Sequence, residues 1–459
     1  MQRSTDPRAA PLGRPLSLSD HIGRTLRLAL PVMAARAGMI IMITVDTAMC
    51  GYAGAAVLAH YGISLAPFVF ILVMGIGCLT GTVVLTAQAD GAGRRQDCGA
   101  IWHSALVLAL VAGVLGGGVL LLGEDLLLLF GQEQSIAAGG GEAMVMSAFG
   151  LPGILLYIAS AFFLEGLGRA TPGMIVALSA NLLNAALNWL LIEGNLGLPG
   201  LGAGGAMLAT TITRWVMFLV IALYILRLRD AAEFRIRGRF TGLGPTAGKL
   251  LRIGLPFSLA ISFESGTFSA VTFFAGRLGE TALAAYQAAH NVTTLVFMLA
   301  IGLGTATAVR VANAIGREDP PGMEIAGWIG LGLVSVLMVA VGLGIGLFEL
   351  PLARVYTEDP AVLAIMVAGL SVIAFLVVVD GAQAVLVSAL RGTGDVVIPT
   401  AIYVLSFPLI AVPAAYYLGL LSGGGVPGLL WGLTIGLVCA AVLLTWRFSA
   451  VCRRTIRPL

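Results

Sequence analysis

The chain is built from long apolar stretches, and this feature limits its possible folds more than any other. Twelve stretches of about 20 residues or more carry few charges: approximately residues 26–50, 56–87, 100–123, 142–165, 172–193, 203–228, 250–275, 283–313, 324–348, 361–390, 396–420 and 427–450. A helix needs roughly 20 apolar residues to cross the ~30 Å hydrocarbon layer of a bilayer. The alternating ~10-residue segments of a β-barrel are absent from these continuous runs. We therefore predict an all-α polytopic membrane protein with twelve transmembrane helices.

Composition excludes a soluble enzyme. Only 11% of the 459 residues are charged, whereas soluble domains carry about 25%. The five cysteines show no CxxC spacing, and the four histidines show no metal-ligand spacing. The phosphate-binding pattern GxxxxGK[ST] and the protease pattern HExxH are also absent. We expect a protein without enzymatic activity or cofactor, which uses no ATP and binds no nucleic acid.

The basic residues are placed asymmetrically along the chain. If the N-terminus lies inside, 21 of the 26 Lys and Arg residues fall in cytoplasmic segments; Arg277 and Arg354 fall in outer loops, and Arg36, Arg214 and Arg310 fall within spans. Cytoplasmic loops of membrane proteins carry such an excess of positive charge. The sequence therefore predicts a multi-pass protein of the plasma (inner) membrane with both termini in the cytoplasm.

The two halves of the chain repeat each other. At an offset of 225, the string Leu26-Arg27-x-x-Leu30-Pro31 matches Leu251-Arg252-x-x-Leu255-Pro256, and Ile76-Gly77-x-x-Thr80-x-Thr82 matches Ile301-Gly302-x-x-Thr305-x-Thr307; at offset 226, Leu164-x-Gly166-x-Gly168 matches Leu390-x-Gly392-x-Gly394. Each half contains six spans, so both halves enter the membrane from the same side. This predicts two lobes related by a pseudo-twofold axis along the membrane normal, as in secondary transporters with parallel repeats.

The repeat also predicts the domain boundaries. They are a cytoplasmic N-terminal tail at 1–25, an N-lobe at 26–229, a basic cytoplasmic linker at 230–249, a C-lobe at 250–450 and a cytoplasmic C-terminal tail at 451–459.

Three acidic residues, Asp46, Glu264 and Asp380, lie well inside predicted spans. A carboxylate at the centre of a membrane helix costs about 2.5–3.5 kcal/mol on insertion scales, so such residues tend to bind or relay something. None of the three has an acidic counterpart in the other half, which indicates that the duplicated fold does not need them. The structural alternative is pairing with a buried arginine. We expect Glu165, by contrast, at the membrane interface.

Amide side chains extend this acidic group. Asn184 and Asn188 are one helical turn apart and therefore share a face. Polar residues on one face of a membrane helix either line a cavity or hold neighbouring helices together. The spacing leaves both interpretations open.

Several motifs together resemble the multidrug and toxic compound extrusion (MATE) family, and its NorM-like branch in particular. They include Val45-Asp46-Thr47-Ala48-Met49-Cys50-Gly51, Glu165-Gly166-Leu167-Gly168 and Ala389-Leu390-Arg391-Gly392-x-Gly394-Asp395, and the resemblance extends over residues 24–450. It departs from the family pattern at Arg36, where an uncharged polar residue is more common.

The resemblance implies export of cationic drugs or dyes in exchange for Na⁺ or H⁺, by a monomer surrounded by membrane lipids. It makes Asp46 the N-lobe carboxylate, with Asn184, Asn188 and Thr210 as candidate oxygen ligands. It makes Glu264 and Asp380 the coupling acids of the C-lobe. A Na⁺ ion would then bind at Glu264 and Asp380, or at Asp46, Asn184 and Asn188.

Two other classes of protein stay open at this point. If Arg36, Arg214 and Arg310 line a cavity, the chain would suit a flippase or exporter of lipid-linked or anionic substrates. A polytopic enzyme or channel is the other alternative, against which stand the missing catalytic motifs and the two-lobe repeat.

Overall fold

The computed structural model describes residues 17–197, 199–238 and 244–454, and every regular element in these ranges is a helix. The N-terminal half holds α1 (Leu18–Ala53), α2 (Ala55–Leu79), α3 (Gly81–Gly91), α4 (Arg95–Leu120), α5 (Gly123–Leu129), α6 (Gln134–Ala148), α7 (Gly150–Gly166), α8 (Thr171–Leu191), η1 (Asn195–Gly197) and α9 (Gly202–Leu226). The C-terminal half holds α10 (Pro245–Arg277), α11 (Glu280–Gly316), α12 (Pro320–Leu347), α13 (Glu349–Arg354), α14 (Pro360–Thr393), α15 (Val397–Ser406), η2 (Phe407–Ala411), α16 (Val412–Tyr416), η3 (Tyr417–Leu421) and α17 (Gly425–Cys452).

These helices confirm the all-α, twelve-span architecture. Eleven of the helical segments described are long and apolar enough to cross a bilayer, and the pair α6 and α7, bent by 42° at its break, makes the twelfth span. The helix α3 continues α2, and the segments from α15 to η3 likewise form a single span over Val397–Leu421.

Helical structure extends beyond the predicted ends of the lobes. Helix α1 begins at Leu18, inside the predicted tail 1–25, because Ser17 and Asp20 form a reciprocal capping box. In the predicted linker 230–249, Phe234 is buried and accepts a backbone hydrogen bond of 2.9 Å from Gly99 of α4. Residues 1–16 of the tail, 239–243 of the linker and 455–459 of the C-terminal tail lie outside the described residues.

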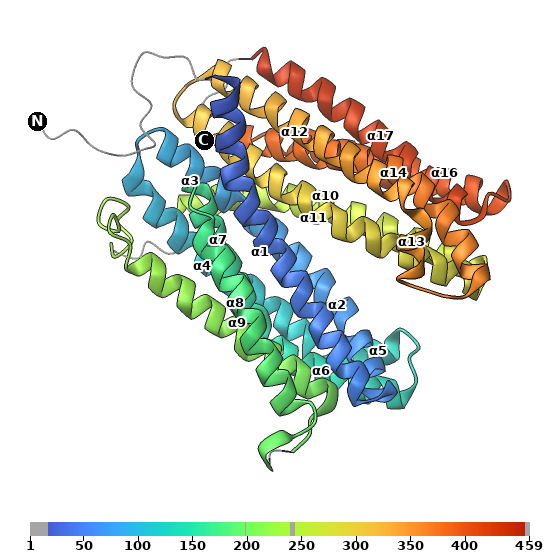
Figure 1. The fold of residues 1–459 in the computed structure, drawn as a ribbon. Helices are drawn as coiled ribbons and strands as arrows, with labels where there is room; N and C mark the ends of the chain where they lie inside the picture. The colour runs from blue at the N-terminus through green and yellow to red at the C-terminus, as the bar shows by residue number, and fades with distance from the viewer. Residues whose placement is uncertain (1–16, 198, 239–243, 455–459) are drawn as a thin grey trace, which may run out of the picture.

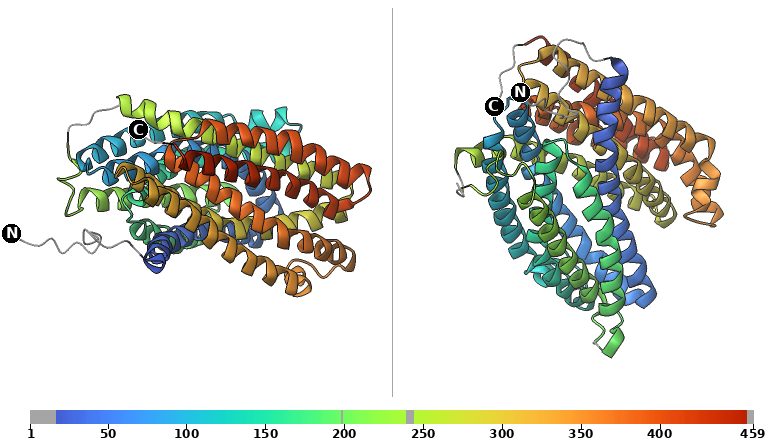
Figure 2. Two further views of the ribbon diagram at one scale, coloured as in Figure 1. Left: turned by 90° about the horizontal axis from the view of Figure 1, so that it is seen from above. Right: turned by 60° about the vertical axis from the view of Figure 1, so that its left-hand side comes forward.

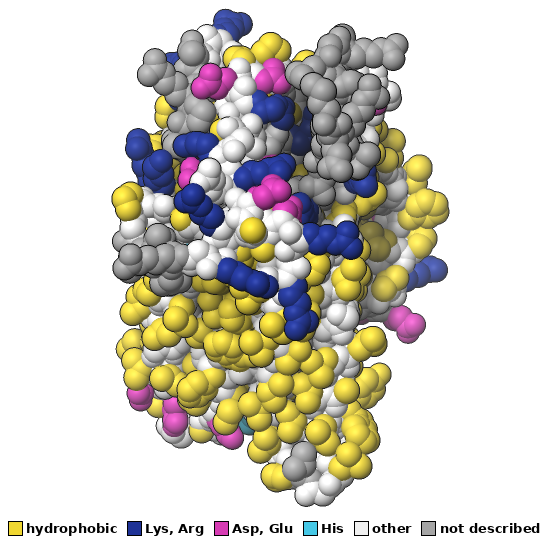
Figure 3. Space-filling view, turned by 90° about the vertical axis from the view of Figure 1, so that its left-hand side faces the viewer, with side chains coloured by type: hydrophobic (Ala, Val, Ile, Leu, Met, Phe, Trp, Pro, Cys, Tyr) yellow, Lys and Arg dark blue, Asp and Glu magenta, His cyan; other side chains and the backbone are white. Residues whose placement is uncertain are grey.

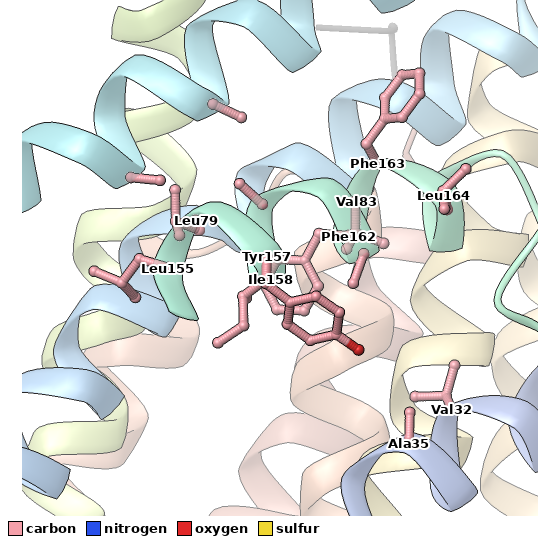
Figure 4. Packing of buried hydrophobic residues seen from close by; sticks show 14 of the residues in the cluster. Val32, Ala35, Leu79, Val83, Leu155, Tyr157, Ile158, Phe162, Phe163 and Leu164 are labelled. Carbon is pink, nitrogen blue, oxygen red and sulfur yellow. The ribbon is translucent and has the colours of Figure 1, made fainter. Parts of the chain in front are cut away.

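Each lobe has one helix that packs against three others. In the N-lobe, every residue of α7 is buried, and α7 packs against α3, α4 and α9. Figure 4 shows side chains of α7, among them Leu155 and Phe162, in one buried cluster with Leu79 and Val83. In the C-lobe, α14 packs against α11, α12 and α17. The two central helices are therefore fixed in place, and side chains on them have defined positions.

Charged and apolar side chains divide the surface into zones. Lys and Arg side chains gather over the upper part of the molecule, and the surface below them is largely apolar (Figure 3). Helix α1 begins at this upper end, which we call the basic end (Figure 1). Below it, large apolar side chains such as Leu182 and Leu343 are 78% and 62% exposed. Lipid tails would cover such a surface in a membrane.

The two lobes meet near the basic end and diverge toward the opposite end (Figures 1 and 2). Between the lobes, α1 packs on α11, α2 on α10 and α3 on α11. The contacts come from the half of each helix that lies at the basic end; Met33 of α1 lies against Gly302 of α11, and Gly77 of α2 against Ser258 of α10. We call this contact surface the seam.

The contacts of the seam occur in matched pairs. A Cβ atom on Gly77 would lie 2.6 Å from Ser258 Cα, and one on Gly302 would lie 3.0 Å from Met33 N. Residues 77 and 302 are repeat equivalents at offset 225, and so are residues 33 and 258. Only glycine allows the two backbones to approach so closely.

A second pair of contacts obeys the same rule. A Cβ on Gly91 would collide with Asn313 O, and a Cβ on Gly316 would collide with Gln88 O. Residues 91 and 316 are repeat equivalents at offset 225, and so are residues 88 and 313. The seam therefore has the pseudo-twofold symmetry predicted from the sequence.

Polar side chains are exposed on the diverging halves of the helices. They include Thr44 and Thr47 on α1, Ser265 and Ser269 on α10, and Asn291 on α11. Thr44, Thr47 and Ser269 each donate to a backbone oxygen one turn earlier in their own helix. The helices themselves therefore satisfy these exposed hydroxyls.

Candidate functional site

Asp46 forms the centre of a polar cluster inside the N-lobe. Its side chain lies on α1 with a residue exposure of only 1%. Asn188 of α8 donates to Asp46 Oδ1 over 2.6 Å, Thr210 of α9 donates to Oδ2 over 2.8 Å, and Tyr61 of α2 donates to Oδ2 over 3.3 Å. Four helices therefore converge on one carboxylate, and all three donors are uncharged.

Asn184 completes this N-lobe cluster. Its Nδ2 donates to Thr210 Oγ1 over 3.1 Å, and its Oδ1 accepts from Asn188 Nδ2 over 3.3 Å. The one-turn spacing of the two asparagines places both amides on the same buried face of α8. The structure thus brings Asp46, Asn184, Asn188 and Thr210 together, as the sequence predicts.

The second cluster lies in the C-lobe, around Glu264 of α10 and Asp380 of α14. One nitrogen, Gln383 Nε2, donates to Glu264 Oε1 over 3.0 Å and to Asp380 Oδ1 over 3.2 Å. Tyr403 of α15 donates its hydroxyl to Gln383 Oε1. All four residues are buried. The predicted pair of coupling acids is therefore held together by an amide that the sequence analysis does not name.

Sequence reasoning misses three residues of these clusters. Gln383 follows Asp380 by three residues, and an amide at that spacing inside an apolar span is a signal that could have identified it. Tyr61 and Tyr403 carry no comparable signal, because a tyrosine in a membrane helix is common at interfaces and in cores alike. Only the packing of α2 and α15 shows where their hydroxyls lie.

None of the three buried acids forms an ion pair within the ranges that the structure describes. Two of the three arginines within the spans have other partners. Arg36 pairs with Glu165 over 3.4 Å, and Arg310 donates to the backbone oxygen of His21. Arg214 is stacked on the ring of Phe68, 4.2 Å from its centroid, and it interacts electrostatically with Asp46.

Two charged residues near helix ends are more buried than we expect from the sequence. Glu165, expected at the membrane interface, is 4% exposed and lies against Arg36. Arg391, counted among the cytoplasmic basic residues, is 6% exposed and belongs to the last turn of α14. The contact between the lobes covers both positions, and a single half of the sequence does not reveal such a contact.

Both clusters can exchange a cation or a proton on chemical grounds. Carboxylate, amide and hydroxyl oxygens are the hard ligands that alkali and alkaline-earth cations prefer. No group of three or more His, Cys, Asp or Glu residues suited to a metal ion occurs in the described chain, so a cation would need amide and hydroxyl oxygens as well. In both clusters an amide nitrogen now faces the carboxylate, and a half-turn of the amide would present its oxygen instead.

Comparison with known proteins places the chain among transporters. The MatE family model matches residues 31–190 and again residues 256–417, one match in each half. The "Probable multidrug resistance protein NorM" of Caulobacter vibrioides is 33% identical over 92% of this chain and 90% of its own length. The "Multidrug resistance protein NorM" of Burkholderia vietnamiensis is 35% identical, with 95% of each chain covered.

Solved structures show the same fold. The eukaryotic MATE transporter AtDTX14 superposes with a TM-score of 0.84 at 20% identity, covering 95% of this chain and 98% of its own. A multidrug resistance MATE family transporter of the MOP superfamily, solved in an outward-facing conformation, superposes with a TM-score of 0.86 at 22% identity, covering 95% and 97%. From the two family matches, the long relatives and this shared fold, it follows that the chain is a membrane transporter of the MATE family.

Proposed function

We propose that this transporter exports cationic amphipathic small molecules in exchange for Na⁺ or H⁺ by alternating access. The observation that carries the proposal is the state of three of its buried acids. Asp46, Glu264 and Asp380 are held by uncharged donors and form no ion pair within the part of the chain that the structure describes. Carboxylates in this condition are open to a cation, a proton or a cationic drug.

Competition for these carboxylates would couple the two movements. A buried carboxylate is costly unless it is neutralised, so it takes up whichever cation reaches it. In the C-lobe the cost is greater, because one amide nitrogen contacts both Glu264 and Asp380 and so brings two like charges close together. An inward-moving ion would release the drug on the far side, and the emptied site would return to the cytoplasm when the lobes rock.

The arginines argue against export of anionic or lipid-linked substrates. That alternative requires Arg36, Arg214 and Arg310 to present free positive charge to a cavity. Arg36 is instead neutralised by Glu165, and Arg310 is bound to the first turns of α1. Arg214 is buried on the ring of Phe68, and its charge acts on Asp46. The cation exporter is therefore the function that the geometry supports better.

The basic end supports the proposed orientation. It carries the start of α1 (Figure 1), and Lys and Arg side chains gather over it on the face shown in Figure 3. Positively charged segments are retained in the cytoplasm. We propose that this end faces the cytoplasm of a plasma (inner) membrane and that the chain works as a monomer among lipids.

Dye efflux from membrane vesicles tests the proposal. Everted vesicles receive either a pH gradient or a Na⁺ gradient, and accumulation of a cationic dye is followed by fluorescence. We expect Asp46→Asn and Asp380→Asn to abolish gradient-driven transport, because an asparagine can neither take up a proton nor bring a negative charge to Na⁺. Asp125→Asn, at an exposed acid of α5, is the matched control. Wild-type rates for both buried variants under both gradients would overturn the coupling role.

The same experiment identifies the coupling ion. Oxygen-rich coordination favours Na⁺, whereas a single acid suffices for a proton. Transport driven by the Na⁺ gradient alone would assign Na⁺, and transport driven by the pH gradient alone would assign H⁺. An anionic dye transported in place of the cationic one would refute the substrate class.

A further inference from the structure

Two residues with opposite charge occupy equivalent positions in the two halves. At offset 226, Glu165 of α7 corresponds to Arg391 of α14, within the repeated strings that end both helices. Equivalent positions approach each other where a pseudo-twofold axis passes between two lobes. Arg36 forms the ion pair with Glu165, and the charge of Arg391 acts on Glu165 from a longer range, without an ion pair between them in the described residues.

Both residues are buried where the lobes meet. Glu165 is 4% exposed and Arg391 is 6% exposed. Glu165 Oε1 is bound by Arg36, whereas its Oε2 and Arg391 Nε have no hydrogen-bond partner within the described residues. The guanidinium of Arg391 lies 4.3 Å from the centroid of the Phe257 ring. We call Arg36, Glu165 and Arg391 the seam cluster.

The seam cluster is continuous with the contacts of the seam. Gln88 of α3 donates its Nε2 to the backbone oxygen of Gly392 over 3.2 Å, directly beside Arg391. The same Gln88 contributes the backbone oxygen on which Gly316 packs. A movement that parts the lobes here must therefore separate Arg391 from Glu165 as well.

We propose that the seam cluster is a latch that keeps the basic end of the molecule closed. The latch rests on the alternating access proposed above and adds to it the residues that hold one of the two states. Glu165 attracts Arg391 across the seam while Arg36, in the same lobe as Glu165, competes for the carboxylate. The cluster carries one negative and two positive charges. An attraction weakened in this way can hold the seam shut and still allow it to open.

Charge balance predicts a different result for each member of the cluster. Glu165→Gln leaves Arg36 and Arg391 as like charges facing each other, which should open the seam most. Arg391→Gln leaves the neutral pair of Arg36 and Glu165 inside one lobe, so attraction between the lobes is lost without repulsion. Arg36→Gln leaves Glu165 and Arg391 as an undisturbed pair of opposite charges and should tighten the seam.

Cys78 can report this opening. It lies on the seam, where its backbone packs against Gly254 of α10. The other four cysteines, Cys50, Cys98, Cys439 and Cys452, are replaced by alanine, and a water-soluble maleimide is added to the purified protein in detergent micelles. The rate of Cys78 labelling then measures how often water reaches the seam, whether or not the protein transports anything.

We expect labelling about tenfold faster or more for Glu165→Gln, an intermediate increase for Arg391→Gln, and no increase for Arg36→Gln. The matched control is Asp395→Asn, which breaks a partly buried ion pair of 2.6 Å with Arg447 inside the C-lobe. Wild-type labelling in both Glu165→Gln and Arg391→Gln would overturn the latch, and so would equal increases in all variants including the control.

Folding and transport are separated from the latch by two further measurements. Size-exclusion chromatography shows whether each variant is monodisperse. One that is not is replaced by an exchanged form, which carries Glu165→Arg and Arg391→Glu together with Arg36→Gln. The exchanged form restores opposite charges across the seam, and its Cys78 should be labelled as slowly as in Arg36→Gln alone. Fast labelling of a folded exchanged form overturns the latch. If the wild-type protein exports the dye but the variants do not change the rate of Cys78 labelling, only the latch is refuted. If the variants change the labelling rate in the expected order but the wild-type protein exports no dye, only the proposed transport function is refuted.

Discussion

Replacing Asp46 by asparagine or by leucine should separate the fold from the function of the N-lobe cluster. In the asparagine variant, the new oxygen can still accept from Thr210 and Tyr61, while the new amide nitrogen faces Asn188. Asn188 must then turn its own amide, so that its unpartnered Oδ1 accepts from residue 46. The turn breaks only its bond to Asn184.

The structure thus predicts a loss of one hydrogen bond for Asp46→Asn, which corresponds to about 1 kcal/mol of unfolding free energy. Leucine offers no acceptor, and three buried donors lose their partner at about 1–3 kcal/mol each. We expect Asp46→Leu to cost at least about 3 kcal/mol. Equilibrium unfolding in mixed micelles, followed by tryptophan fluorescence, measures both.

The critical result is the ratio of the two losses of unfolding free energy, one for Asp46→Asn and one for Asp46→Leu. Equal destabilisation by asparagine and leucine would show that the amide rearrangement does not occur and that the hydrogen-bond count is not what stabilises the cluster. A stable Asp46→Asn protein that has lost transport would show that the charge, and not the fold, is required for function.

Three further predictions follow from other parts of the structure. Tyr403→Phe leaves the buried Gln383 Oε1 of the C-lobe cluster without its donor and should lower the unfolding free energy by about 1–3 kcal/mol in the same assay. Gly91→Ala and Gly316→Ala place a methyl group against opposing backbone, so both should accelerate Cys78 labelling to a similar extent, and unequal effects would contradict the symmetry of the seam. The hydrogen bond from Arg169 holds the pKa of Asp230 below its ordinary value of 3.8. The stability that this bond supplies is present at neutral pH and should be lost as the pH falls through the lowered pKa. Arg169→Gln should weaken this pH dependence when unfolding is measured over the acidic range.

Much of the fold could be predicted because the bilayer imposes it. Span length and the excess of positive charge on one side are physical consequences of the membrane, and both can be read from sequence. The bent span of α6 and α7 shows the limit, since its first helix begins at Gln134, eight residues before the predicted boundary at 142. Apolar content alone does not mark where a broken helix starts.

The candidate site was predictable where a residue type is rare. An acid inside an apolar span is conspicuous, so Asp46, Glu264 and Asp380 could be named from sequence. Gln383 and Tyr61 could not be assigned with equal ease, because their role depends on which neighbour their polar atoms reach. Contacts between the lobes were the least predictable feature, since each lobe contributes only half of every contact.

The opposite charges of Glu165 and Arg391 have a consequence for the origin of the molecule. A symmetric dimer of identical half-length chains would place the same residue twice at this position, and two identical charges would repel each other. Two unlike charges can therefore face each other only after the two copies have acquired different sequences. Duplication supplied the symmetric glycine contacts, and later divergence of the copies supplied the attraction between them.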